Sequence, residues 1–94
     1  MNSHKSLDGK CALITGGGRG IGRTTALAMA KAGANLAILD LDIDKAKETQ
    51  ALASKFGTSV CSISADASNE KSVIKAFDRA VKFFDGTLDI LVSN

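Results

Sequence analysis

Two features of the sequence predict an α/β fold, in which helices cover both faces of a parallel sheet. Four short apolar runs lack the alternation of polar and apolar residues that marks a strand with one wet face, and segments with helical periodicity separate them. Strands joined through helices pair in parallel by right-handed crossovers. The chain has 94 residues, of which 45% are hydrophobic, so it is long enough for one small domain with its own core.

The four predicted strands correspond to the apolar runs at residues 11–14, 36–39, 60–63 and 90–92. In the common doubly wound order 3-2-1-4-5-6, these strands supply the part 3-2-1-4. The strand order then reverses between the first and the fourth strand. Ligands bind at this point in open α/β sheets, so we expect at least part of a ligand crevice at the carboxyl edge of the sheet.

Three helices are predicted between the strands, the first of them over residues 23–32. Apolar or small residues recur at helical spacing as Ile21, Thr25, Ala28 and Ala32, then as Ile43, Ala46, Leu52 and Phe56, and then as Val73, Phe77, Ala80, Val81 and Phe84. Gly33, Gly57 and Gly86 follow these segments where a glycine commonly closes a helix. Ser68 is the predicted N-cap of the third helix.

The composition argues against several classes of partner. The net charge is +2 and the charges are scattered, which predicts no binding to nucleic acid or to a membrane surface. No apolar run has the length of a signal peptide or a membrane span, so a cytoplasmic location is expected. Cys11 and Cys61 fall in the first and third strands, roughly 9–10 Å apart across the second, and are expected to be small buried hydrophobes beyond disulfide reach.

The segment from Thr15 to Gly22 (TGGGRGIG) has five glycines where the first strand turns into the first helix. Glycine allows positive φ and lets an anion approach the backbone, and the helix that follows directs free N–H groups and its positive dipole end at that anion. The strict G-x-G-x-x-G spacing is absent, but G-x-x-x-G-x-G is present. A tight turn alone needs only one or two glycines, so the segment predicts a phosphate-binding loop.

Two kinds of nucleotide site fit this loop. A dinucleotide site requires an acidic residue after the second strand, about 20 residues on, and Asp40 stands there. A P-loop is the weaker alternative, because Arg23 replaces the required lysine and a planar guanidinium does not substitute for a compact ammonium. The run Asp40, Asp42, Asp44 resembles a calcium loop but lacks its glycine, so no metal site is expected, and Asp42 and Asp44 are interpreted as charges at a helix N-terminus.

Four motifs in order resemble the classical short-chain dehydrogenases/reductases. Residues 7–10 (LDGK) look like the family's lead-in to strand one, and residues 15–22 match its T-G-x-x-x-G-I-G cofactor loop. Asp66 and Ala67 match its adenine-contacting pair, and residues 88–94 (LDILVSN) run into its N-N-A-G motif, with Ser93 in place of the first asparagine. The resemblance implies a Rossmann-like three-layer αβα domain, with residues 1–94 as its N-terminal half and residues 1–8 flexible.

The same resemblance implies the site residues and the cofactor. Cofactor contacts are expected from Thr15, Gly16, Gly18, Arg19, Gly20, Ile21, Gly22, Asp40, Leu41, Asp66, Ala67 and Asn94. Within this set, residues 19–21 would contact the pyrophosphate and adjoining ribose, Asp40 the adenosine ribose, Asp66 the adenine, and Asn94 would lie near the nicotinamide-side ribose. Asp40 favours NAD because a carboxylate repels a 2′-phosphate, whereas Arg19 is a feature that some NADP-preferring members share.

In this family a serine and a Tyr-x-x-x-Lys pair beyond N-N-A-G carry out hydride transfer, and the chain contains no tyrosine. The resemblance therefore implies the N-terminal part of an alcohol or carbonyl oxidoreductase, either truncated or partial in sequence, with no catalytic residue of its own. Full-length members are usually homo-oligomers. An unpaired edge of the fourth strand would make this chain prone to aggregation, and a non-enzymatic fragment that pairs through this edge is the alternative function.

Overall fold

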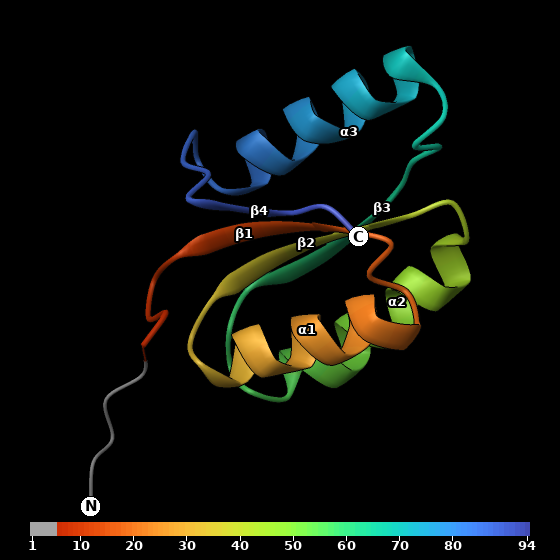
Figure 1. The fold of residues 1–94 in the computed structure, drawn as a ribbon. Coiled ribbons are helices and arrows are strands. Elements are labelled where there is room, and N and C mark those ends of the chain that lie inside the picture. Colours follow the sequence, from red (N-terminus) through yellow and green to blue (C-terminus); the bar gives the residue numbers. More distant parts are fainter. Residues whose placement is uncertain (1–5) are drawn as a thin grey trace, which may run out of the picture.

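The computed structural model describes residues 6–94 and contains the predicted elements in the predicted order (Figure 1). The elements are β1 (Cys11–Thr15), α1 (Gly20–Lys31), β2 (Asn35–Asp40), α2 (Ile43–Ser54), β3 (Val60–Ser64), α3 (Glu70–Phe83) and β4 (Ile90–Val92). Helix α1 begins three residues earlier than predicted, so Gly20, Ile21 and Gly22 form its first turn. Within residues 6–94, no helix combines the length and apolar character needed to cross a membrane.

The four strands form one parallel sheet in the predicted order β3-β2-β1-β4. Helices α1 and α2 cover one face and α3 covers the other, which gives three layers (Figure 1). The order reverses at β1, which pairs with β2 on one side and with β4 on the other. The predicted α/β class, strand order and switch point are therefore confirmed.

Large strand residues and small helix residues make up the core. On the α1/α2 face, Ile14, Leu36 and Ile38 have no exposed surface, and the helices present Ala26, Ala30, Ala46 and Ala53 to them. On the α3 face, Leu13, Leu39 and Ile63 pack with Ala76, Ala80 and Phe84. Alanine lets the helices approach the sheet closely, while each buried leucine or isoleucine contributes about 1.5–3 kcal/mol.

The helix faces predicted from apolar spacing are partly wrong. Ile21 is 77% exposed, and Leu52 and Phe56 also lie at the surface, whereas Thr49 is fully buried. On α3, Ala80 and Phe84 are buried as predicted, but Val73 and Phe77 are exposed. Because the sheet is contacted mainly through alanines, the larger side chains lie on the flanks of each helix, and periodicity of large residues points to the wrong side.

Most of the predicted helix ends are confirmed. Gly33, Gly57 and Gly86 all have positive φ after their helices. Asp42 is the N-cap of α2, where its side chain accepts from the N–H groups of Asp44 and Lys45. Ser68 is not the N-cap of α3: Asn69 occupies this position and accepts from the N–H of Ser72.

The two cysteines lie on β1 and β3 with β2 between them, as predicted, and both thiols are free. Cys11 is buried, but Cys61 is only partly buried, so the expectation of two buried thiols holds for one. Partial burial raises the pKa of Cys61 to about 11. The positive charge of Arg79 lowers this pKa, but its effect is smaller than that of burial. The Cys61 thiol therefore stays protonated, and so unreactive, at neutral pH.

The described part of the N-terminal segment is tied to the end of α1. Leu7 N–H donates to Ala32 O at 2.9 Å and Gly9 N–H donates to Gly33 O at 3.3 Å. Leu7, which belongs to the stretch predicted to be flexible, thus has a backbone hydrogen bond to the C-cap residue of α1. Residues 1–5 of that stretch lie outside the described residues.

Large apolar side chains are exposed on the α3 side of the sheet. Ile90 and Val92 pack toward the α1/α2 core, so Leu91 between them faces the α3 side, where it is 58% exposed. Ile74 and Phe77 of α3 are exposed as well. Strand β4 pairs with β1 along one edge, and no strand among residues 6–94 pairs with its other edge.

Candidate functional site

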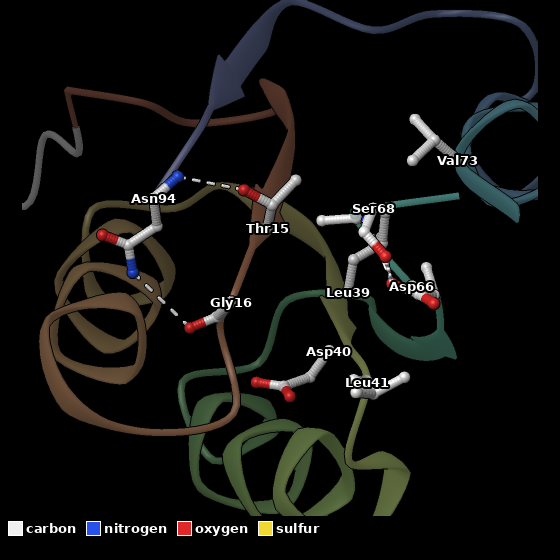
Figure 2. A pocket seen from close by; sticks show the side chains of 11 residues that line it. Thr15, Gly16, Leu39, Asp40, Leu41, Asp66, Ser68, Val73 and Asn94 are labelled. Atoms are coloured by element: carbon white, nitrogen blue, oxygen red, sulfur yellow. Dashed lines mark hydrogen bonds between the residues drawn. The ribbon is translucent and has the colours of Figure 1, made fainter. Parts of the chain in front are cut away.

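A pocket of about 380 Å³ opens at the carboxyl ends of the strands, where the strand order reverses. Figure 2 shows Asn94 on one side, Ser68 and Asp66 on the opposite side, and Asp40 and Leu41 along a third. The lining residues come from the carboxyl ends of β1 and β2 with the residue after each, from the β3–α3 connection and α3, and from the segment after β4: Thr15, Gly16, Leu39, Asp40, Leu41, Ala65, Asp66, Ala67, Ser68, Val73 and Asn94. Its size and position are those of a small-molecule site in an open α/β sheet.

The glycine-rich loop packs so closely that side chains are excluded at several positions. An added Cβ on Gly17 would lie 2.7 Å from Ile38 Cγ2 in the core. At Gly22 it would lie 2.6 Å from Asn94 Nδ2 and closer still to the carbonyl oxygen of Gly16, which has a φ of +65°. The backbone of the loop therefore lies directly against the first turn of α1, where free N–H groups can meet an anion.

Thr15 and Asn94 connect the glycine loop to the end of β4. Asn94 N–H donates to Thr15 Oγ1 at 3.0 Å, and the Thr15 hydroxyl donates to Val92 O at 3.4 Å (Figure 2). The Asn94 amide also reaches Gly16 O at 3.5 Å. At the other end of β4, Asp89 and Cys11 exchange two hydrogen bonds, of 2.8 and 2.9 Å. These contacts hold the short strand β4, and with it one wall of the pocket, against β1.

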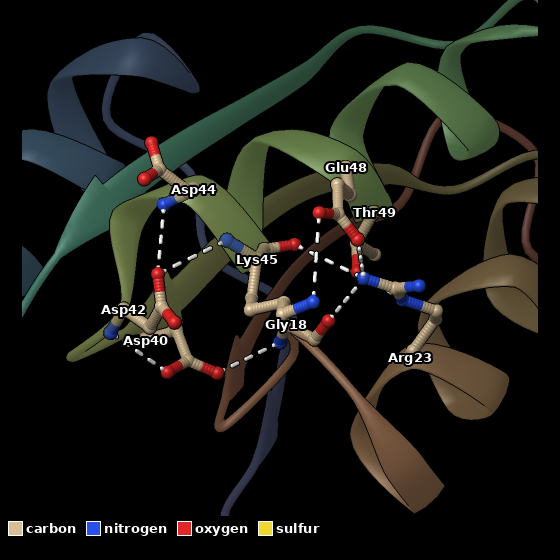
Figure 3. Close-up of polar contacts among 8 residues, drawn as sticks. All are labelled: Gly18, Arg23, Asp40, Asp42, Asp44, Lys45, Glu48 and Thr49. Carbon is tan, nitrogen blue, oxygen red and sulfur yellow. Dashed lines mark hydrogen bonds and ion pairs between the residues drawn. The ribbon is translucent and has the colours of Figure 1, made fainter.

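Backbone donors fix the Asp40 carboxylate at the end of β2. Its Oδ2 accepts from Gly18 N–H at 2.9 Å, and its Oδ1 accepts from Asp42 N–H at 3.0 Å (Figure 3). Each carboxylate oxygen retains a further lone pair. Asp40 is only partly buried and lines the pocket, so it can accept two more hydrogen bonds from a ligand there.

Asp66 lies across the pocket, after β3. Ser68 donates to Asp66 Oδ1 through its hydroxyl at 2.6 Å and its backbone N–H at 2.9 Å. These two bonds lower the pKa of Asp66, the hydroxyl having the larger effect, so the side chain is a carboxylate acceptor at neutral pH. This Asx turn uses Ser68 as a partner of Asp66, which explains why Asn69 takes over the N-cap position.

Seven of the twelve predicted site residues line the pocket: Thr15, Gly16, Asp40, Leu41, Asp66, Ala67 and Asn94. The other five (Gly18, Arg19, Gly20, Ile21 and Gly22) lie in the loop and first turn of α1, outside the lining. Gly18 and Gly22 are buried, whereas Arg19 and Ile21 are exposed to solvent. Within residues 6–94 the Arg19 guanidinium forms no ion pair, so it is free to interact with an anion near the loop.

The sequence interpretation missed Leu39, Ala65, Ser68 and Val73, which also line the pocket. Leu39 and Ala65 belong to the strand ends that carry Asp40 and Asp66. Val73 stands one helical turn after the α3 N-cap. It is 39% exposed and forms part of the pocket wall. Their closeness in sequence to the two aspartates could have identified them.

Arg23 does not face the place where a P-loop lysine would act. Its Nε donates to Thr49 Oγ1 at 2.9 Å and its Nη2 pairs with Glu48 Oε1 at 3.0 Å, both on α2 (Figure 3). The hydrogen bond from Arg23 and the nearby Lys45 ammonium lower the pKa of Glu48. The guanidinium is thus engaged behind the loop, which argues against the P-loop interpretation.

Residues 10–94 match the profile of a protein family described as short chain dehydrogenase. Among curated proteins, tropinone reductase-like 1 from Erythroxylum coca is 44% identical over 91 residues, which cover 97% of this chain and 32% of that protein. The chain thus spans about a third of the length of the curated relatives it matches.

Solved structures with cofactor share the fold. The NAD⁺-bound xylitol dehydrogenase superposes with a TM-score of 0.89 at 34% identity, over 93% of this chain and 33% of that one. The 3-ketoacyl-(acyl-carrier-protein) reductase from Brucella melitensis in complex with NADH superposes with a TM-score of 0.82 at 40% identity, over 92% of this chain and 34% of that one.

Proposed function

Because this chain belongs to the short-chain dehydrogenase family, we propose that its pocket binds the adenosine and diphosphate part of NAD. The observation that carries the proposal is the Asp40 carboxylate, which two backbone N–H groups hold at the pocket edge with lone pairs to spare. Similar solved structures contain NAD⁺ or NADH, which supports the choice of a dinucleotide.

The residues present fit each part of such a ligand. The loop from Gly16 to Gly22 exposes backbone beside a helix N-terminus, which suits a diphosphate. Asp40 suits the 2′- and 3′-hydroxyls of the adenosine ribose, and Asp66 on the opposite wall suits the exocyclic amino group of adenine. Leu39, Leu41, Ala65 and Val73 supply apolar surface for the adenine ring.

The charge of Asp40 favours NAD over NADP. Hydrogen bonds from ribose hydroxyls to a carboxylate contribute about 1.5–3 kcal/mol each, whereas a 2′-phosphate in the same place would bring like charges together. The exposed Arg19 offers an opposing charge that would favour the phosphate. We expect Asp40 to prevail, because its carboxylate is fixed in position and Arg19 has no partner among residues 6–94 that would hold it there.

Replacing Asp40 by alanine and Leu41 by arginine is therefore expected to weaken NAD and AMP binding at least about tenfold and to move the preference toward NADP and 2′-phosphorylated AMP. Calorimetric titration of the Asp40→Ala/Leu41→Arg variant and of the unaltered chain with each nucleotide measures this change. Asp44→Ala, which replaces an exposed aspartate in the first turn of α2, serves as the control. An unchanged NAD:NADP ratio would refute the assignment of Asp40, and tight magnesium-dependent ATP binding would favour a P-loop function instead.

The activity that we propose for the complete domain is hydride transfer between a nicotinamide and an alcohol or carbonyl group. The cofactor supplies the hydride acceptor or donor, and the part of the site seen in this chain holds its adenosine end. The 94 residues contain no tyrosine and hence no Tyr-x-x-x-Lys pair, so we expect them to bind the cofactor without turning over a substrate.

A second function is favoured by the open edge of β4 and the exposed Leu91 beside it. A row of unpaired backbone groups next to apolar side chains is a template for association with another chain. We expect the unaltered chain to elute above its monomer mass in size-exclusion chromatography with light scattering, and Leu91→Lys to shift it toward the monomer. Leu52→Lys on α2 is the matched control, and a monomer at all concentrations would rule out this function.

A further inference from the structure

Gly18 is hydrogen-bonded on both sides of its Cα, and it joins Asp40 to a charged network behind the loop that Figure 3 shows. Its N–H donates to Asp40 Oδ2 at 2.9 Å, and its carbonyl accepts from Arg23 Nη2. Gly18 fits closely at this place, because an added Cβ would lie 2.6 Å from Asp40 Oδ2 and 2.8 Å from Lys45 Cβ. Gly18 therefore connects Arg23 to one of the two backbone donors that hold Asp40, the other being the N–H of Asp42.

Arg23 is anchored on α2 by several further contacts. Its Nε donates to the hydroxyl of Thr49, the one polar residue that is fully buried among residues 6–94. Its Nη2 also reaches Lys45 O at 3.4 Å and the exposed Glu48 carboxylate at 3.0 Å. The planar guanidinium fixes its donors relative to one another, so an Arg23 that is held by Thr49 presents a donor to Gly18 at a set position.

We propose that Arg23 is a positioning residue for ribose recognition, which acts through Gly18 to hold Asp40 in the orientation that accepts the 2′- and 3′-hydroxyls. This role rests on the proposed function of the pocket. Arg23 of α1 and Thr49 of α2 thereby contribute to the choice between NAD and NADP without touching the ligand. The buried Thr49 contributes to this role, because its hydrogen bond fixes the rotamer of Arg23.

A double-mutant cycle distinguishes this role from general structural support. Arg23→Met keeps the length of the aliphatic stem and removes every donor, and it is expected to weaken AMP binding about tenfold while binding of 2′-phosphorylated AMP changes less than twofold. In the Asp40→Ala background the same substitution should have little further effect on AMP. An equal loss for both nucleotides, or an undiminished loss in the Asp40→Ala background, would overturn the proposal.

The matched control is Glu48→Gln, which removes the exposed ion pair of Arg23 and leaves its bonds to Gly18 and Thr49. This variant is expected to bind AMP within twofold of the unaltered chain. Should Arg23→Met fail to fold, Thr49→Val provides the test, because it removes the anchor of Nε while keeping a side chain of similar shape. It should reduce AMP affinity in the same selective way.

Amide hydrogen exchange at Gly18 provides a measurement that needs no ligand. Arg23→Met should accelerate exchange of the Gly18 N–H more than tenfold relative to the N–H groups of β1 and β2, and Glu48→Gln should not. Unchanged exchange would overturn the role of Arg23. If the unaltered chain binds no AMP, the proposed function fails, and ribose recognition by Arg23 fails with it, while the exchange rates still decide whether Arg23 orders the loop.

Discussion

Replacement of Gly22 by alanine is expected to destabilise the chain by about 2 kcal/mol or more and to abolish nucleotide binding. Alanine is normally the better helix former by about 1 kcal/mol, so helix propensity alone predicts the opposite sign. The close packing decides the outcome: the new Cβ would lie 2.6 Å from Asn94 Nδ2 and still closer to Gly16 O, which is backbone and cannot rotate away. Urea denaturation and AMP titration measure the two effects.

The control for this substitution lies two turns along the same helix. Ala28 is exposed, and Ala28→Gly should cost only the ordinary propensity difference of about 1 kcal/mol and leave AMP binding unchanged. If Gly22→Ala proved stabilising, the first turn of α1 would have room for a side chain. The close approach of Gly16 to the helix would then be wrong.

Ile38→Ala is the second substitution with a large expected effect, a loss of about 2–5 kcal/mol in the free energy of unfolding. Ile38 has no exposed surface, lies on the central strand β2, and supports the glycine loop where Gly17 passes over its methyl group. A domain of this size is stable by only about 5–14 kcal/mol, so the variant should lose a large share of its stability and unfold at a clearly lower temperature.

Ile74→Ala makes the same chemical change on the exposed side of α3, where 60% of the residue is accessible. Its expected cost is below about 0.5 kcal/mol, as for surface substitutions in general. Thermal unfolding followed by circular dichroism compares the two variants. Equal losses would mean that the α3 face is buried in solution, through association with another chain.

The order of elements and the strand pairing could be predicted because each depends on local patterns. The apolar runs that form β1 and β2 are covered on both faces of the sheet. Their continuous hydrophobicity therefore predicts that they are interior strands. Gly33, Gly57 and Gly86 mark helix ends through backbone conformation, which needs no knowledge of the rest of the fold. Asp40 followed from its position after the second strand, whereas Asp66 came from the resemblance to the short-chain dehydrogenases/reductases.

The helix faces and the network behind the loop could not be predicted from the same patterns. Ile21 and Leu52 stand at the apolar spacing of their helices and are nevertheless exposed, while fully buried alanines lie against the sheet. Thr49 has no sequence feature that marks it as buried, because its burial depends on Arg23 from another helix. Such contacts join residues 26 apart in the chain, and only the packed structure shows them.

The hydrogen bonds that join Asn94 to Thr15 also bear on the order in which the site assembles. They link residues 79 apart, among the longest separations in the chain, so their formation carries a large loop-closure entropy. Residues 11–40 can bring the glycine loop and Asp40 together through the neighbouring strands β1 and β2. Pairing of β4 with β1 is therefore expected to be the slow step of folding, and the adenosine side of the pocket should form before its opposite wall closes.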